Sequence, residues 1–272
     1  MIIGHSVAFM LFCLSAHKFR FRVLDSVYFP PGKAGNVLRG ALASALDFAR
    51  APKSLPSGLA EPPRPFVLRA AHLDAKRLGR GEVFSFDLHL FGCPGPLEQR
   101  FEHAVAHLAE TGLGPRRGRV EFLRPASCTP VMLELSPDAG APKRVAIRFC
   151  TPTELKGGPS RDGAPFGVLF RRIRDRVSTL RSLYGEGPLP IDFKALSQRA
   201  DLIRTVKCDL QYRGIERRSS RTGAVHGIGG FTGTAEYEGD LAEFLPYLRA
   251  AWWTGVGRYT VWGNGVIEIV GS

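Results

Sequence analysis

The order of strand-like and helix-like segments restricts this chain more than any other feature of its sequence. In the first half, apolar residues alternate with polar ones where we expect strands, and recur every three or four positions where we expect helices. The expected strands cover residues 17–24, 65–73, 82–91 and 119–123, and the expected helices cover residues 36–50 and 96–111. The resulting order, β-α-β-β-α-β, is that of a ferredoxin-like unit. It ends near Pro125, and we expect the first domain to cover residues 1–127.

The second half repeats this order with additional segments. The expected strands cover residues 144–150, 207–213, 232–237 and 266–270, and the expected helices cover residues 166–184, 193–204 and 241–253. A stretch rich in proline and glycine, residues 136–142, links the halves. We therefore expect a second, elaborated unit over residues 128–272, and an α+β protein with tandem ferredoxin-like (RRM-like) domains. Two similar halves imply an old duplication, although they show no convincing sequence match.

The charge of the chain favours a polyanionic partner. Its 37 Lys and Arg outnumber its 25 Asp and Glu, which gives a formal net charge of +12. Such a balance suits nucleic acid or an anionic membrane face. Arginine supplies much of the excess, and its planar guanidinium group binds two phosphate oxygens at once. Residues 7–16 are apolar, but the segment lacks the basic start of a signal peptide and is short for a membrane span, so we expect it to lead into the first strand.

Two segments concentrate the positive charge. In the helix expected at residues 166–184, only Asp175 offsets five arginines, which are Arg171, Arg172, Arg174, Arg176 and Arg181. This helix presents either an ordinary solvated face or a phosphate-binding face. The loop that follows residue 212 carries four more arginines among glycines and serines, namely Arg213, Arg217, Arg218 and Arg221. A loop of this polarity suits contacts with a phosphate backbone.

Near the C-terminal end, four glycines lie close together: Gly255, Gly257, Gly263 and Gly265. Glycine in such density indicates unusual φ/ψ angles or close approach of two backbones. Successive amides of such a turn can face one anion, and Arg258 would add charge. The alternative is a glycine-rich β-hairpin packed by tryptophans. The stretch lacks both GxxxxGK[ST] and GxGxxG, so it is neither a P-loop nor a dinucleotide fingerprint.

The cysteines and histidines indicate neither a disulfide framework nor a metal centre. The five cysteines lie far apart without a CxxC pair, so we expect buried free thiols and a reducing compartment, the cytoplasm. His103 and His107 have the spacing of a metal-binding pair, but no third ligand stands near them in the sequence. We find no HExxH motif, no paired DxD and no carboxylate cluster for Mg²⁺. The sequence therefore predicts no metal or other cofactor.

Several segments, taken in order, resemble one family. They are PPGKAGNVLRGALASAL at the first helix, FDLHLFG at the third strand, TGLGPRRGRVEF before the fourth strand, and GGFTG followed by WWTGVGRYTVWGNG near the C-terminal end. From about residue 17 onward, this ordered set resembles the CRISPR-associated repeat-RNA endoribonucleases of the RAMP superfamily. Departures from the family pattern suggest a divergent member, of the kind that accompanies type IV systems.

The resemblance implies a function and a set of partners. Proteins of this family cleave precursor CRISPR RNA within each repeat, without a metal. A ribose 2′-OH attacks the neighbouring phosphate and leaves a 2′,3′-cyclic phosphate and a 5′-OH. The implied partners are the repeat stem-loop, which can stay bound after cleavage, and other subunits of a CRISPR complex, with no membrane.

The catalytic residues of the family do not carry over directly. Many relatives have a histidine in or near the first helix, but this chain has none between His17 and His72, and Gly255 stands where some relatives have histidine. The candidates are His226 and His17 as general acid or base, Tyr28 to orient a phosphate or only to pack, and Arg39 to stabilise charge near the start of the first helix. Either histidine can instead have a structural role.

The candidate RNA-binding residues combine the basic segments with the glycine-rich stretch. They are Lys33, Arg171, Arg172, Arg174, Arg217, Arg218, Arg221, Gly255, Gly257, Arg258, Gly263 and Gly265. The missing first-helix histidine leaves a second hypothesis open, a non-catalytic RNA-binding subunit of a CRISPR ribonucleoprotein. That hypothesis predicts tight, salt-dependent binding without cleavage.

Overall fold

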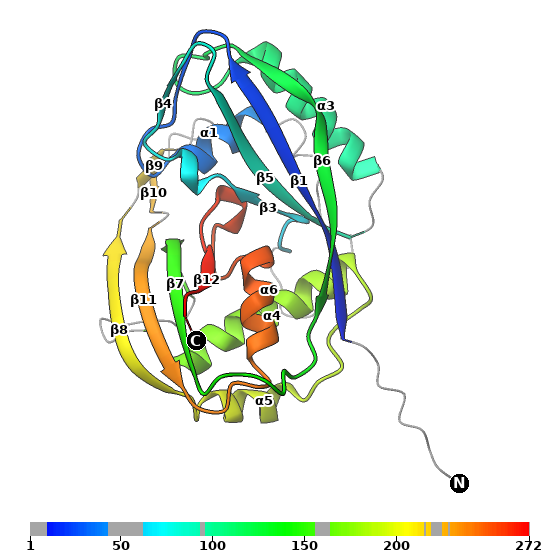
Figure 1. Cartoon of the computed structure of the whole chain (residues 1–272), viewed down its shortest axis with the longest axis vertical. Coiled ribbons are helices and arrows are strands. Elements are labelled where there is room, and N and C mark those ends of the chain that lie inside the picture. Colours follow the sequence, from blue (N-terminus) through cyan, green and yellow to red (C-terminus); the bar gives the residue numbers. More distant parts are fainter. Residues whose placement is uncertain are drawn as a thin grey trace.

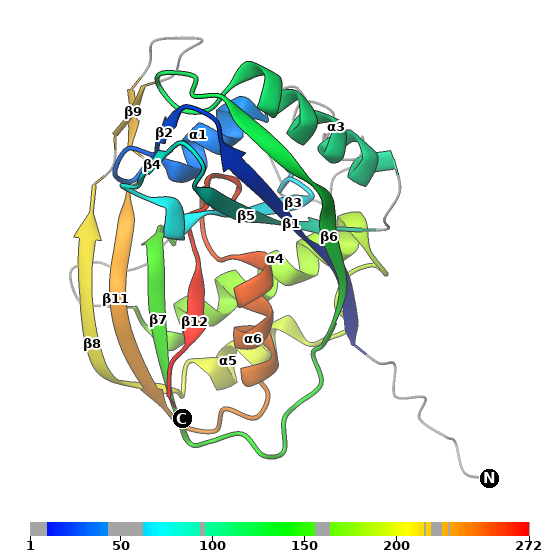
Figure 2. The same cartoon turned by 45° about the horizontal axis from the view of Figure 1, so that its top comes forward.

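The structure is a computed structural model that describes residues 10–42, 62–92, 96–155, 164–214, 216–218, 225–227 and 229–271. Within these residues the chain forms two units, each built on a four-stranded antiparallel sheet. In Figure 1 the first unit lies at the top and the second lies below it, and Figure 2 shows the same arrangement after rotation. The long strand β6 (Val120–Glu134) carries the chain from the first unit toward the second.

The first unit has the strand order β3-β5-β1-β6. Its elements, in chain order, are β1 (Leu11–Val23), β2 (Ser26–Tyr28), α1 (Ala34–Ala41), β3 (Phe66–Arg69), η1 (Ala71–Leu73), β4 (Arg77–Gly79), β5 (Val83–Phe91), α3 (Pro96–Thr111) and β6. Strands β2 and β4 form a separate two-stranded ribbon. Alternation along β1 buries Phe19, Phe21 and Val23 in a core shared with α1 and α3, and leaves the intervening residues exposed.

The second unit repeats this topology with the strand order β12-β7-β11-β8. Its elements are β7 (Arg144–Thr153), α4 (Phe166–Tyr184), α5 (Phe193–Ala200), β8 (Arg204–Arg213), β9 (Glu216–Arg218), β10 (Val225–Gly227), β11 (Gly230–Glu238), α6 (Leu245–Thr254), η2 (Thr260–Trp262) and β12 (Ile267–Ile269). Strands β9 and β10 pair with each other and extend the β8–β11 hairpin toward the end of the first unit where β2 and β4 lie (Figures 1 and 2).

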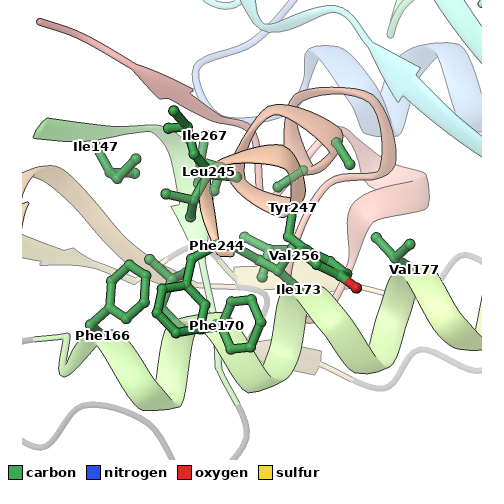
Figure 3. Close-up of a cluster of buried hydrophobic side chains, with 14 of the residues drawn as sticks. Ile147, Phe166, Phe170, Ile173, Val177, Phe244, Leu245, Tyr247, Val256 and Ile267 are labelled. Carbon is green, nitrogen blue, oxygen red and sulfur yellow. The ribbon is translucent and has the colours of Figure 1, made fainter. Parts of the chain in front are cut away.

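A core of aromatic and aliphatic residues holds the second unit together. Phe166 and Phe170 on α4 contact Phe244 and Tyr247 edge to face, with ring centroids 4.7–5.4 Å apart (Figure 3). The same cluster includes residues of the first sheet, among them Phe12, Leu14 and Phe91. In Figure 1, α4 and α6 lie between the second sheet and the lower ends of β1 and β6. The core of the second unit therefore extends onto the first sheet, whereas the residues packed between that sheet, α1 and α3 form a second cluster.

The predicted fold class, tandem ferredoxin-like units in an α+β protein, is confirmed. The strand orders follow from β-α-β-β-α-β connections in which the first strand pairs with both the third and the fourth. Helices 96–111 and 166–184 have the predicted bounds. Strand β1 begins earlier than predicted, at Leu11, and β6 continues beyond the predicted strand to Glu134. The division that we placed after residue 127 falls inside β6.

Three helices differ from their predicted extents. The helix predicted for residues 193–204 ends at Ala200, and Arg204 already begins β8. The first helix begins at Ala34 rather than at residue 36, and residues 43–50 of its predicted span lie outside the described residues. The helix predicted for residues 241–253 begins only at Leu245. The residues before Leu245 form a turn, and Pro246 lies in the first turn of the helix. Proline suits the first turn of a helix, where its missing amide hydrogen has no partner to lose.

The cysteine prediction is half right. Among the described residues, four cysteines form no disulfide, as expected, but all four are exposed rather than buried: Cys13, Cys128, Cys150 and Cys208. Cys93 lies outside the described residues. Alternation explains the exposure of Cys13 and Cys150, whose neighbours in the sequence are buried, whereas the residues on both sides of Cys128 and Cys208 are exposed as well. Among the described residues, no helix is both long enough and apolar enough to cross a bilayer.

Candidate functional site

A cavity of about 700 Å³ opens where α1, η1, the glycine-rich segment and the ends of β7, β8 and β11 meet. We call it the α1 cavity. The first unit contributes the turn before α1 and the segment after β3, and the second unit contributes the rest. The lining includes Gly32, Gly35, Asp74, Thr151, Arg213, Thr232, Trp262, Gly263 and Asn264. The cavity thus brings the first helix and the glycine-rich stretch together.

The four glycines of the glycine-rich segment (residues 255–265) all have positive φ, between 67° and 85°. A Cβ atom on Gly257 would collide with the carbonyl oxygen of Glu154, and one on Gly265 would collide with the carbonyl oxygen of Val256. The expectation of unusual φ angles and close backbone approach is confirmed. The alternative of a simple hairpin is wrong, because the segment contains the short helix η2, and the chain joins a sheet only after it, as β12.

The expected cradle of free amides is not formed by these glycines. Gly255, Gly263 and Gly265 donate their amide hydrogens to carbonyl oxygens of Ala251, Thr260 and Pro152, at 2.9, 3.1 and 3.0 Å. These donors are used within the protein because the segment packs tightly against β7 and α6. Arg258, the expected source of charge, pairs with Glu154 at 2.9 Å.

The first helix is fastened to the glycine-rich segment by two contacts. The guanidinium carbon of Arg39 lies 3.9 Å from the centroid of the Trp262 ring, a cation–π contact. A Cβ atom on Gly35 would collide with the carbonyl oxygen of Trp262, so only glycine fits there. Arg39 lies in the last turn of the described helix, not near its start as we expected.

The N-terminal end of α1 already holds an anion. The Asp74 carboxylate accepts hydrogen bonds from the amides of Gly32 at 2.7 Å, Lys33 at 3.0 Å and Ala34 at 3.3 Å. A carboxylate at this position neutralises the helix dipole and satisfies the free amides. The phosphate site that we expected at this helix end is therefore filled by the protein itself. The side chain of Lys33 is exposed beside the cavity.

The arginines of α4 do not form a continuous phosphate-binding face. Arg174 is 5 % exposed and donates to the Phe193 carbonyl and Ser197 hydroxyl. Arg176 donates to the Thr254 carbonyl at 2.7 Å and the Thr260 hydroxyl at 2.8 Å. Arg171, which is partly exposed, pairs with Asp201 at 2.7 Å. The structure thus corrects our interpretation: most of this charge holds helices and loops together. Arg172 is partly exposed on the same helix.

A second cavity, of about 580 Å³, lies between the units, and we call it the inter-unit cavity. Ala70, Ala71 and Cys150 line both cavities, so the two are adjacent. Arg69, which is 8 % exposed, donates from Nη2 to the carbonyl oxygen of Trp252, whereas its buried Nε and Nη1 have no hydrogen-bond partner among the described residues. Burial, with the nearby Arg176 charge, lowers the pKa of Arg69 to about 9, which still leaves it charged at neutral pH.

His89 forms part of the contact between the units beside this cavity. Its Nδ1 lies 2.9 Å from the carbonyl oxygen of Trp253, and its ring centroid lies 4.9 Å from that of Trp253. Burial, followed by the Arg69 charge, lowers the pKa of His89 to about 4. His89 is therefore neutral near pH 7, and its Nδ1–H donates to Trp253.

Three of the predicted catalytic residues lie apart from the α1 cavity or are only partly described. His17 is 4 % exposed and its ring is directed at Glu98 of α3, with Nε2 3.0 Å from the carboxylate. Tyr28 packs under Arg77, whose guanidinium carbon lies 4.2 Å from the ring centroid. The backbone of His226 lies in β10 and pairs with that of Arg217 in β9, and the structure does not describe their side chains. Arg221 lies outside the described residues, and the side chain of Arg218 is likewise not described.

Sequence reasoning missed two residues and one contact that shape the site. Asp74 stands 40 or more positions from the amides it binds, and no local pattern links them. Arg69 is the one polar residue in the apolar strand β3, and this pattern is only a weak indication of a buried charge. The stacking of Arg39 on Trp262 joins segments over 200 positions apart. Each depends on how the two units meet, which the pattern of one segment does not encode.

Comparisons with known proteins follow the same division into two units. Residues 147–267, from β7 to the start of β12, match the family model for the CRISPR-associated endoribonuclease Cas6. Residues 48–132 match a second model, described as an N-terminal domain. A search of curated protein sequences gives no match.

Among solved structures, a Cas6 product complex has a TM-score of 0.58 at 18 % identity, covering 94 % of this chain and 99 % of that one. Thermus thermophilus Cas6 gives a TM-score of 0.57 at 15 % identity, covering 95 % and 99 %. A partial Cas6-RT-Cas1–Cas2 complex gives a TM-score of 0.59 at 11 % identity, covering 96 % of this chain and 46 % of that one. Identities this low show a shared fold.

The fold and the position of the glycine-rich segment define the class, a protein of tandem ferredoxin-like units in which this segment packs on the first helix. The resemblance seen in the sequence is supported over residues 147–267, which match the model of the CRISPR-associated endoribonuclease Cas6 family.

Proposed function

We propose that this protein is an endoribonuclease that cleaves precursor CRISPR RNA within the repeat. One observation carries the proposal: the matched residues, 147–267, include the glycine-rich segment and the part of β7 that form one wall of the α1 cavity. The other wall is α1, where relatives of the resembled family hold catalytic residues. The scissile phosphate would therefore lie at the mouth of this cavity.

The proposed chemistry uses the RNA's own 2′-OH as nucleophile and needs no metal. The hydroxyl loses its proton to a base, attacks the adjacent phosphorus, and forms a 2′,3′-cyclic phosphate while the 5′-oxygen leaves with a proton from an acid. We assign His226 as the acid or base, since the β9–β10 hairpin that carries it extends from the strands lining the cavity. Lys33 and Arg213 would stabilise the crowded phosphate.

RNA binding would follow the adjoining cavities and the basic hairpin. Arg213 is exposed at the end of β8 and lines the α1 cavity. Arg69 has two buried nitrogens with no hydrogen-bond partner in the part of the chain that the structure describes; they lie beside the inter-unit cavity, and a phosphate oxygen would satisfy them. Arg217, Arg218 and Arg221 would extend the contact along a stem that is recognised by shape and phosphates.

The decisive assay is cleavage of repeat RNA in the presence of EDTA. We expect product with a 2′,3′-cyclic phosphate, and no product when the nucleotide before the cut carries a 2′-deoxyribose. His226→Gln should lower the cleavage rate by about 100-fold or more, the range expected for general acid–base catalysis. His103→Gln serves as the control, because His103 is exposed on α3, on the outer side of the first unit. Cleavage of the deoxy substrate would exclude the proposed nucleophile.

Binding is tested with two arginines on one strand. Arg213 ends β8 at the cavity and Arg204 begins it, about 30 Å away at the rise of a β-strand. We expect Arg213→Gln to weaken RNA affinity several-fold and to reduce its salt dependence, and Arg204→Gln to do neither. Equal effects of the two changes would contradict a binding site at the cavity.

A second function is favoured by one observation. Among the described residues that line the α1 cavity, none is a histidine. If His226 does not supply the proton transfer, the protein would bind CRISPR RNA without cutting it, as a subunit of a larger complex. The likeness to a chain of a Cas6-RT-Cas1–Cas2 complex supports such partners. Tight RNA binding with no cleavage of the matching repeat would establish this function.

A further inference from the structure

Three potential metal ligands converge on the helix-covered face of the first sheet. His17 comes from β1, Glu98 from the first turn of α3, and Cys128 from β6. The Nε2 atom of His17 lies 3.0 Å from Oε1 of Glu98 and 3.7 Å from Sγ of Cys128, and the sulfur lies 3.8 Å from the same carboxylate oxygen. His17 stacks beside Phe19, with ring centroids 6.2 Å apart, so this cluster lies on the core side of the sheet.

Hydrogen bonding alone does not account for the crowding around His17. Its Nε2 atom has a third neighbour, the hydroxyl of Ser15 at 2.9 Å. One imidazole nitrogen carries either one hydrogen or one lone pair, so it satisfies one of these three neighbours at a time. Each of the carboxylate, thiol and imidazole groups is a ligand for a transition metal, and a cation between them would engage all three at once.

We propose that His17, Glu98 and Cys128 bind one Zn²⁺ ion. In a tetrahedral site, Zn–N and Zn–O bonds of about 2.0 Å and a Zn–S bond of about 2.3 Å separate N from O by about 3.3 Å and S from each by about 3.5 Å. The observed separations of 3.0, 3.7 and 3.8 Å differ from these by about 0.3 Å or less. The three atoms thus form one face of a zinc tetrahedron before any metal binds.

The fourth position is open to water or to a second carboxylate. Glu102 lies one helical turn after Glu98 on α3, is exposed, and its charge acts on both His17 and Cys128. Because Cys128 is exposed and the Glu98 side chain is 24 % exposed, an ion can reach the site from solvent. A neutral imidazole, a thiolate and a carboxylate together balance the two charges of zinc, which lowers the cost of placing the ion beside the core.

Binding would release a proton. Zinc binds the thiolate, so coordination replaces the hydrogen of the Cys128 thiol by zinc and delivers that proton to solvent. The site ties α3 to two strands of the first sheet. His17 also lines the inter-unit cavity, but the cluster contains none of the residues assigned to cleavage, which are His226, Lys33 and Arg213, so its role is structural and is compatible with metal-independent chemistry.

The test uses the full-length, tag-free protein, freed of metal by a chelator and titrated with Co²⁺ and then Zn²⁺. Tetrahedral Co²⁺ bound to a thiolate gives intense visible d–d bands and a sulfur-to-metal charge-transfer band. We expect saturation at one equivalent of Co²⁺, displacement by one equivalent of Zn²⁺, and a higher Tm with zinc. Cys128→Ser should abolish the charge-transfer band, and Cys208→Ser, which changes an exposed cysteine on β8, should retain it.

Glu98→Gln provides the second variant, because it keeps the size of the side chain and removes the charge. We expect it to weaken Zn²⁺ binding at least about tenfold, and circular dichroism of the metal-free variants would show that they remain folded. A wild-type spectrum without the charge-transfer band would overturn the proposal. So would a band that persists in Cys128→Ser, or a Zn²⁺ affinity that Glu98→Gln leaves unchanged. RNA cleavage is read separately, so neither outcome decides the proposed activity.

Discussion

At the scale of single residues, several arginines of α4 act as hydrogen-bond donors to the protein itself. Arg176 is the clearest case, because it is mostly buried and joins α4 to Thr254, just before the glycine-rich segment, and to Thr260, in the middle of it. We expect Arg176→Met to lower the free energy of unfolding by about 2–4 kcal/mol, since it leaves buried acceptors unpaired. Arg171→Met, which removes a partly exposed pair with Asp201, should cost under about 1 kcal/mol. Urea unfolding measures the loss of unfolding free energy in both variants. Equal losses would contradict the prediction that Arg176 contributes more to stability than Arg171.

His89 gives a prediction on pH at the same scale. Its pKa is lowered to about 4 in the folded protein, against about 6.5 in the unfolded chain. Between these values the unfolded chain binds a proton that the folded protein does not. The free energy of unfolding should therefore fall as pH drops from about 6.5 to about 4, by up to about 3 kcal/mol. His89→Asn retains a donor for the Trp253 carbonyl and does not titrate, so its stability should depend less on pH in this range. Parallel pH dependence of the two proteins would show that His89 is not the cause.

At the scale of elements, α4 shows what the sequence predicts and what it leaves open. The spacing of Phe166, Phe170, Ile173 and Val177 predicts both the helix and its buried face, because periodicity is a local property. The partners of its arginines depend on carbonyl oxygens brought near by other segments. For the same reason, the glycines at residues 255–265 predict positive φ angles, but not that their amides are already used. The sequence thus predicts local backbone geometry. The hydrogen-bond partner of a polar group depends on the assembled fold.

The contact between α1 and η2 gives a matched pair of substitutions within one helix. A Cβ atom on Gly35 would meet the Trp262 carbonyl, whereas one on Gly40 would have nothing within 4 Å. We expect Gly35→Ala to destabilise the protein by about 1–3 kcal/mol through overpacking, and to lower RNA cleavage because it pushes the glycine-rich segment off α1. Gly40→Ala should instead stabilise by about 0.5–1 kcal/mol, since alanine favours the helix. Thermal unfolding and cleavage rates of both variants check this; an inactive Gly40→Ala would argue against the contact as the cause.

At the scale of the whole molecule, the two units are joined by more than a linker. The core of the second unit contains Phe12 and Phe91 of the first sheet, and Arg181 of α4 donates to the Leu11 carbonyl at 2.8 Å. His89 and Arg69 bind carbonyls of α6 from the other side of the boundary. The sequence predicts two repeated units because each follows its own periodic pattern. It does not predict how the two units pack against each other. The contacting residues lie far apart in the sequence, and each looks like an ordinary core or surface position.

Because the two units pack against each other in this way, we expect the whole chain to unfold in one cooperative transition. Phe84 is 5 % exposed and packs against Phe21 and Phe29 in the core of the first unit, while all three tryptophans of the chain lie in the second. We expect Phe84→Ala to destabilise by about 3–5 kcal/mol. The loss should appear equally in tryptophan fluorescence and in amide hydrogen exchange of β1 and β5, because disruption of the first core also removes contacts that the second unit needs. A fluorescence midpoint that stays at the wild-type value while exchange of the first sheet accelerates would mean that the units unfold independently.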